Sequence, residues 1–243
     1  MRLDKLLVAT GFGSRKEVKA LLKSGQVTLN SVICKKAETK VDVTGDRVEV
    51  SGQSVRYQEY YYYLLNKPAG VISATEDNYQ QTVIDWLGDE YRHMALFPVG
   101  RLDIDTTGLL LLTNNGQLAH QLLSPKKKVT KRYRATIEGV VTQTDVEQFA
   151  EGLDLGDFIT QPAQLSILYV NEEAATSEIE VTIMEGKFHQ VKRMFRKVGK
   201  IVTTLHRVAM GPLVLEETLA VGDWRELTEE EMLSLANYGV GVE

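Results

Sequence analysis

The chain has 243 residues, of which 43% are hydrophobic and 25% are charged, so it can bury a sizeable core and form one or two domains. No apolar stretch approaches the length of a membrane span, and the first residues lack the features of a signal peptide, which predicts a cytoplasmic protein. The net charge of −5 argues against indiscriminate binding to nucleic acid, and the single cysteine, Cys34, excludes an internal disulfide.

Residues 1–60 are basic although the whole chain is acidic: they contain 11 lysines and arginines against 7 acids, and the remainder contains 17 against 26. Apolar spacing predicts a helix that ends at Gly11, then a second helix with a capping box between Ser14 and Glu17, then a β region to about residue 50. The basic side chains form either a nucleic-acid contact or an ordinary solvated face. They are Arg2, Lys5, Arg15, Lys16, Lys19 and Lys23.

A polar stretch without apolar periodicity predicts a linker, and with it two domains, residues 1–58 and 59–243. The second domain is expected to open with a strand from Tyr60 to Leu65 and a turn that contains Lys67. Lys67 could contact a phosphate group or be an ordinary turn lysine. A short helix over residues 82–87 is expected next.

Two apolar runs, residues 96–99 and 109–112, predict buried strands that enclose a polar loop. The loop contains two carboxylates, Asp103 and Asp105, with an arginine, two threonines and two glycines. These residues alone are compatible with a plain hairpin loop or with a paired-carboxylate site of the glycosidase type. Two aspartates without a neighbouring histidine make a poor metal site, so no metal is expected.

The loop resembles the signature of RNA pseudouridine synthases, in the branch typified by the RsuA enzymes of ribosomal RNA. The matching residues are Gly100-Arg101-Leu102-Asp103-x-x-Thr106-x-Gly108-Leu109. In that family the aspartate directly after Arg-Leu is the catalytic nucleophile, which implies Asp103, whereas Asp105 falls at a variable position. Arg101 and Thr106 are expected to contact the substrate, although Arg101 could instead brace the loop.

The next elements are predicted to be a helix over residues 117–123, a lysine triplet at 126–128 and a strand from Lys131 to Ile137. The triplet is either a phosphate contact or a solvated run. Composition alone would make Tyr133 a core aromatic, but the family has an active-site tyrosine in this strand, which implies a catalytic role for Tyr133. The elements expected to follow, without evident chemistry, are a helix over 142–153 and strands over 165–170 and 179–184.

Apolar residues spaced at i, i+3, i+4 and i+7 from Val191 predict a helix with one buried stripe and a basic opposite side. Its start resembles the last motif of the same family. The residues that match are Glu185-Gly186-x-x-His189-Gln190-Val191-Lys192-Arg193-Met194. In that family a basic residue of this motif lies against the catalytic aspartate, which implies Lys192. Arg193 is the alternative for this role, and if Lys192 fills it, Arg193 is expected to contact the substrate. His189 is expected to be structural.

The basic segment resembles the small S4 RNA-binding domain, which often precedes pseudouridine synthase domains. The matching stretches are Arg2-Leu3-Asp4-Lys5, Ser14-Arg15 and Gly25-x-Val27-x-Leu29-Asn30. This favours RNA binding by its six basic side chains. The implied fold is α+β, with a small helical-β S4-like domain followed by a pseudouridine synthase domain on a mixed, mainly antiparallel sheet. A strand from residue 201 and a helix capped by Thr228 and Glu231 are expected to close the chain.

The implied activity is isomerisation of a specific uridine to pseudouridine in 16S (small-subunit) ribosomal RNA by a monomer that needs no cofactor. The stretch Leu205-His206-Arg207 is closer to the small-subunit enzymes than to the large-subunit ones. Two alternatives stay open: a large-subunit enzyme of the same family, and a non-catalytic RNA-binding or ribosome-assembly protein. The set Asp103, Tyr133 and Lys192 argues against the second.

Overall fold

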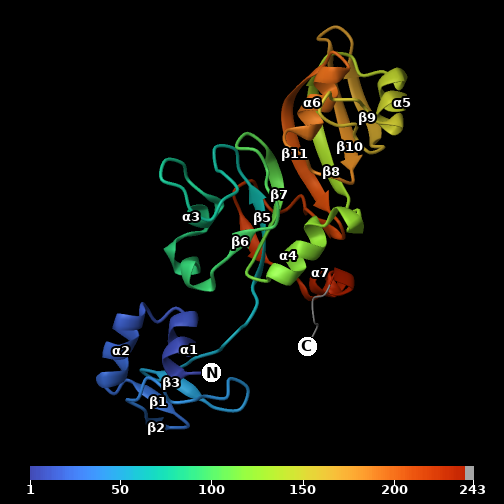
Figure 1. Cartoon of the computed structure of the whole chain (residues 1–243). Coiled ribbons are helices and arrows are strands. Elements are labelled where there is room, and N and C mark those ends of the chain that lie inside the picture. Colours follow the sequence, from blue (N-terminus) through green and yellow to red (C-terminus); the bar gives the residue numbers. More distant parts are fainter. Residues whose placement is uncertain (239–243) are drawn as a thin grey trace. The chain divides into compact units, whose positions relative to one another are not determined.

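Figure 1 shows a computed structural model of the chain, which describes residues 1–238. Two compact units are present: Met1–Tyr61 with Leu87–Leu96, and Tyr62–Trp86 with the chain from Phe97 onward. Each unit has its own sheet. Residues 239–243, the end of the predicted second domain, lie outside the described residues, and the domain boundary between residues 58 and 59 stays a prediction.

The amino-terminal unit packs two helices, α1 (Leu3–Ala9) and α2 (Arg15–Lys23), through a core of leucines and valines. The capping box predicted for α2 is confirmed: the Ser14 hydroxyl accepts from the backbone N–H of Glu17, whose carboxylate accepts from the N–H of Ser14. The sheet of this unit has the order β2-β1-β3-β4. Its strands are β1 (Val27–Leu29), β2 (Val32–Ile33), β3 (Val48–Val50) and β4 (Gln53–Ser54).

The larger unit is built on a nine-stranded sheet. Seven of its strands follow one another in the order β13-β5-β7-β11-β8-β10-β9, while β6 pairs with β7 and β12 pairs with β11. Its strands are β5 (Tyr62–Lys67), β6 (Phe97–Pro98), β7 (Thr107–Thr113), β8 (Lys131–Glu138), β9 (Gln164–Asn171), β10 (Thr176–Ile183), β11 (Ile201–Met210), β12 (Leu213–Val214) and β13 (Trp224–Glu226). Among the described strands of this sheet only the β7–β11 pair is parallel. The predicted mixed, mainly antiparallel sheet is confirmed.

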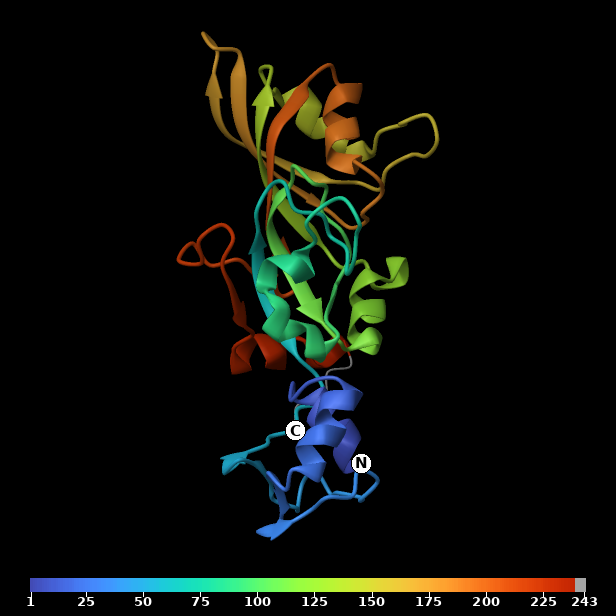
Figure 2. The ribbon, with the colours of Figure 1, turned by 90° about the vertical axis from the view of Figure 1, so that its left-hand side faces the viewer.

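Helices cover this sheet in two places, and Figure 2 shows them beside its lower and upper parts. At β5 and β7, leucines of α4 (Gly116–Leu123) pack into a hydrophobic core cluster. Apolar residues of the carboxy-terminal segment that contains α7 (Glu229–Ser234) belong to the same cluster. Against β9 and β11 lie α5 (Gln143–Glu151) and α6 (Gln190–Lys197), whose Phe149 and Phe195 rings are 4.9 Å apart. The remaining helical segments are α3 (Val83–Leu87) and the 3₁₀ turns η1 (Asp89–Met94), η2 (Pro125–Lys127) and η3 (Ala236–Tyr238).

The parallel pair β7–β11 is a close seam that fixes where the aspartate loop lies. Gly108 at the start of β7 has φ +103°, and a Cβ added there would come within 2.3 Å of the carbonyl oxygen of Arg207. Only glycine fits such an approach. The seam therefore places residues 100–106, which directly precede β7, beside β11 and its neighbour β8.

One predicted strand is shorter than expected. The apolar run over residues 96–99 forms only β6, because Pro98 has no N–H to donate and Gly100 turns the chain at φ +78°. The loop predicted between the two apolar runs is confirmed for residues 100–106. In the part of the chain that the structure describes, no helix is both long and apolar enough to span a membrane.

Candidate active site

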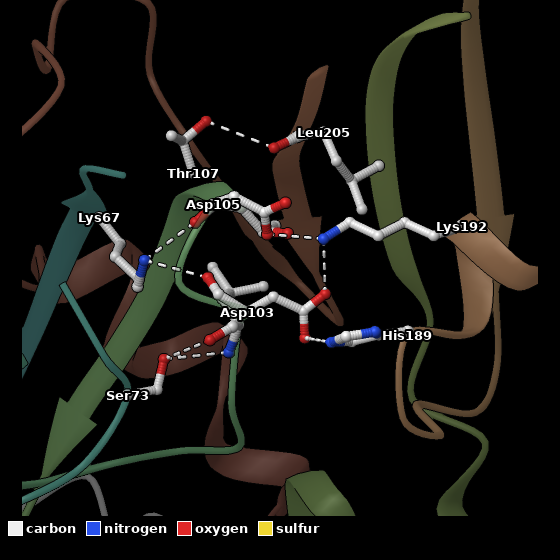
Figure 3. Close-up of polar contacts among 10 residues, drawn as sticks. Lys67, Ser73, Asp103, Asp105, Thr107, His189, Lys192 and Leu205 are labelled. Atoms are coloured by element: carbon white, nitrogen blue, oxygen red, sulfur yellow. Dashed lines mark hydrogen bonds and ion pairs between the residues drawn. The ribbon is translucent and has the colours of Figure 1, made fainter. Parts of the chain in front are cut away.

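Lys192 on α6 lies between the two carboxylates of the loop, as Figure 3 shows. Its Nζ is 2.9 Å from Oδ2 of Asp103 and 2.6 Å from Oδ1 of Asp105. The side chains of Lys192 and Asp103 are only 20% and 26% exposed, whereas that of Asp105 is 67% exposed. The contact predicted between Lys192 and Asp103 is present, and it joins residues 89 positions apart.

Lys192 stays charged at neutral pH. Burial would lower the pKa of Lys192, but the hydrogen bonds to Asp105 and Asp103 outweigh it and leave the pKa above its ordinary value. The hydrogen bond from Lys192 in turn holds the pKa of Asp105 below its ordinary value. The loop therefore presents a half-buried carboxylate, Asp103, beside a permanent cation.

His189 lies on the other side of Asp103 and is closer to the site than the sequence suggested. Its Nε2 is 3.5 Å from Oδ1 of Asp103, and its backbone is left-handed, with φ +49°, immediately before α6 begins. A single histidine gives no spacing pattern, which is why it was expected to be structural. The available signal was its position three residues before Lys192, which is about one helical turn.

Asp103 borders a hollow of about 60 Å³ that is walled by Tyr133 on β8 and Leu205 on β11. Tyr133 is 7% exposed, so its ring forms part of the wall. Thr106 is buried in the same lining, and among the described residues its hydroxyl oxygen has no hydrogen-bond partner. Arg101 also lines the hollow and is exposed. The site thus combines an ion-paired carboxylate, an aromatic wall and an unused hydroxyl.

The structure corrects the expectation that Lys67 contacts phosphate. Alternation along β5 turns this side chain beneath the aspartate loop, where it is 0% exposed. Its three ammonium hydrogens are matched by three carbonyl oxygens, those of Pro68 at 2.9 Å, Asp103 at 3.2 Å and Thr106 at 3.0 Å. No donor remains for a substrate, so Lys67 holds the loop from below.

This position gives a testable pH dependence of stability. Burial lowers the pKa of Lys67 from 10.5 to about 8, so between these values the unfolded chain binds more protons than the folded one. The free energy of unfolding should therefore rise relative to that of Lys67→Met as the pH increases from 8 to 10, by up to about 3 kcal/mol. Urea unfolding of the wild type and of Lys67→Met at pH 8 and at pH 10 measures this difference in free energy. The exposed-lysine variant Lys126→Met should show no such divergence, and parallel curves for Lys67→Met would refute the assignment.

Arg193 likewise lies elsewhere than predicted. Its guanidinium donates to both carboxylate oxygens of Asp157 and to the carbonyl of Leu155 at 3.3 Å, and it does not line the hollow of Asp103. Its charge is therefore used to tie α6 to the loop after α5. Lys192, not Arg193, is the partner of Asp103.

In the amino-terminal unit, four of the six predicted RNA-binding side chains border one groove of about 530 Å³ along α1 and α2: Arg2, Lys5, Arg15 and Lys19. Lys16 and Lys23 are exposed but do not line it. The guanidinium of Arg2 donates two hydrogen bonds to the carboxylate of Asp4, which leaves only its other N–H groups for RNA. Among residues 1–238 no group of side chains is arranged to hold a metal ion.

Comparison with known proteins finds two family profiles that match this chain. The family profile of RNA pseudouridylate synthases matches residues 61–197, and that of the S4 domain matches residues 1–48. The chain is 47% identical to an uncharacterised RNA pseudouridine synthase of Bacillus subtilis, over 96% of this chain and 97% of the relative. It is 42% identical to the ribosomal small subunit pseudouridine synthase A of Vibrio cholerae, over 97% and 99% of the two chains.

A second Bacillus subtilis relative, ribosomal large subunit pseudouridine synthase B, is 38% identical over 98% of each chain. Among solved structures, one described as a pseudouridylate synthase superposes with a TM-score of 0.66 at 34% identity, covering 97% of this chain and 99% of the other. The chain thus belongs to the RNA pseudouridine synthase family, enzymes that isomerise uridine in RNA, and has an S4 domain at its amino-terminal end.

Proposed function

We propose that the protein converts one uridine of small-subunit ribosomal RNA to pseudouridine, with Asp103 as the nucleophile. The observation behind the proposal is the half-buried Asp103 carboxylate, ion-paired to Lys192 at the edge of an aromatic-walled hollow. Small-subunit RNA is favoured by the Vibrio cholerae relative and by the stretch Leu205-His206-Arg207. The protein is proposed to act as a monomer in the cytoplasm.

The reaction breaks the N1–C1′ bond, turns the base and joins C5 to C1′, so that C5 loses a proton and N1 gains one. Asp103 can open it by attack at C1′ or by removing a sugar proton to form a glycal. Lys192 holds a positive charge beside this carboxylate in a partly closed site. Tyr133 packs on the base, and the unused hydroxyl of Thr106 bonds to one of its polar edges. Arg101 contacts a phosphate beside the hollow.

A uridine within folded RNA reaches Asp103 only after it has left its stack, at a cost of roughly a few kcal/mol. Contacts outside the hollow must offset that cost. We propose that the groove of α1 and α2, with Arg2, Lys5, Arg15 and Lys19, provides most of them through phosphates. Lys16 and Lys23, which are exposed on α2, add a longer-range electrostatic attraction for RNA.

The groove predicts a salt effect. Each lost phosphate contact lowers the slope of log affinity against log salt by about 0.7–0.9, so the triple variant Lys5→Ala, Arg15→Ala and Lys19→Ala should flatten it by roughly 2 to 3. Filter binding of rRNA from 50 to 300 mM salt measures the slope. The double variant Lys35→Ala and Lys36→Ala, in the same unit but outside the groove, is the control. An unchanged slope in the triple variant would rule the groove out as the anchor.

Pseudouridine mapping of both ribosomal RNAs in a strain without this gene tests the proposed function. One site lost from small-subunit RNA, restored by the wild-type gene but not by Asp103→Asn, supports it. A site lost from large-subunit RNA alone would assign the protein to the alternative that the second Bacillus subtilis relative represents. Unchanged RNA of both subunits would exclude both assignments.

A further inference from the structure

Phe188 is an exposed aromatic residue beside the site that the proposed reaction does not use. It is 75% exposed, and its ring stacks on that of His189 with centroids 3.8 Å apart and planes 18° from parallel. His189 in turn lies 3.5 Å from the carboxylate of Asp103. One ring separates Phe188 from the proposed nucleophile, and most of the Phe188 ring surface is open to solvent.

The segment that presents this ring is held firmly. The buried side chain of Gln190 accepts a hydrogen bond from the backbone N–H of Lys187 at 3.0 Å and donates one to Glu185 at 2.8 Å. Lys187 places its ammonium 3.6 Å from the ring centre of Phe158. His189 adopts a left-handed backbone, a conformation that costs energy in a non-glycine residue. An exposed ring fixed in this way is pre-organised for a ligand.

Basic side chains without an acidic partner lie at the hollow and at the far end of α6. On α6, Lys192 and Arg193 are paired with aspartates, but for the exposed Arg196 and Lys197 no carboxylate lies within 4 Å among residues 1–238. Arg101 at the hollow is also exposed. Bases of unpaired RNA stack on aromatic side chains, and basic groups along the path of the strand hold its backbone. Only the target base leaves its stack to enter the hollow, so the neighbours of the target uridine lie outside it.

We propose that Phe188 and His189 form a platform on which the base next to the target uridine stacks. The proposal deepens the proposed function and rests on the target being held at Asp103. It makes Phe188 a residue that selects RNA in which the neighbouring base is free to unstack. A ribosomal protein contacting the same ring is the competing explanation, and the test separates the two.

The first measurement is tritium release from ribosomal RNA labelled at uridine C5 and purified from a strain without the gene, which contains the substrate whichever subunit holds it. Phe188→Ala should raise KM about tenfold and leave kcat within about threefold, because one stacked base is lost. Phe188→Trp should restore the wild-type KM. Tyr169→Ala, which removes an aromatic residue 60% exposed on the edge strand β9, should change neither constant.

The second measurement is fluorescence of Phe188→Trp, which the same RNA should quench, whereas Tyr169→Trp should keep its signal. An unchanged KM in Phe188→Ala, a loss of kcat alone without rescue by Phe188→Trp, or quenching only by ribosomal proteins would each overturn the platform. If the wild-type enzyme released no tritium, the proposed function would fail, and quenching by RNA would still decide whether the platform exists.

Discussion

Asp103→Asn is expected to reduce pseudouridine formation by at least about a thousandfold, because asparagine keeps the volume of the side chain but removes the proposed nucleophile. RNA affinity and thermal unfolding should stay close to wild type, since the side chain is half-buried and its change is isosteric. Tritium release from C5-labelled ribosomal RNA measures the loss, and filter binding measures the affinity.

Asp105→Asn is the matched control, because Asp105 belongs to the same loop and shares Lys192 with Asp103. Its side chain is 67% exposed, and an exposed ion pair contributes roughly 0–1 kcal/mol, so activity should stay within about tenfold of wild type. If Asp105→Asn were inactive and Asp103→Asn active, the nucleophile would be Asp105 and the assignment made from the motif would be wrong.

Lys192→Met is the second large effect expected, with a loss of about a hundredfold or more in kcat. Methionine retains most of the aliphatic stem but leaves the Asp103 carboxylate without its cation. Because the charge of Lys192 is paired with two carboxylates and not with a phosphate, removing it should change RNA affinity only a few-fold. Single-turnover rates at saturating RNA separate the chemical step from binding.

Lys197→Met on the same helix is the control for the lost positive charge, because Lys197 is exposed and outside the hollow of Asp103. It should reduce affinity slightly and leave the single-turnover rate unchanged. Lys192→Arg, which keeps the charge with a different reach, should recover part of the activity. Equal rates for Lys192→Met and the wild type would show that the ion pair is not needed for the chemistry.

The elements found where the sequence predicted them depend on local patterns. The capping box at Ser14, the four buried leucines of β7 and the apolar stripe of α6 each follow from residues within one or two turns or along one strand. The pairing of Lys192 with Asp103 was inferred from family motifs, since no local pattern joins residues 89 positions apart.

The features that the sequence missed depend on distant neighbours. Lys67 is buried only because the aspartate loop folds over the end of β5, which no property of the turn itself reveals. Arg193 turns away because Asp157, on an irregular loop, happens to face it. The approach of His189 to Asp103 depends on a left-handed residue that a histidine adopts uncommonly.

The strand order of the large sheet has a consequence for when the enzyme becomes active during its synthesis. The strand β5, made early, is completed by β13, where Trp224 pairs with Leu65, and Asn66 bonds to a carbonyl 153 residues later. A translating ribosome must therefore release almost the whole chain before this sheet can close, and contacts so distant in sequence form slowly. A chain cut short before residue 224 would expose β5 as an unpaired edge prone to aggregation. Only chains that include β13 should thus become active.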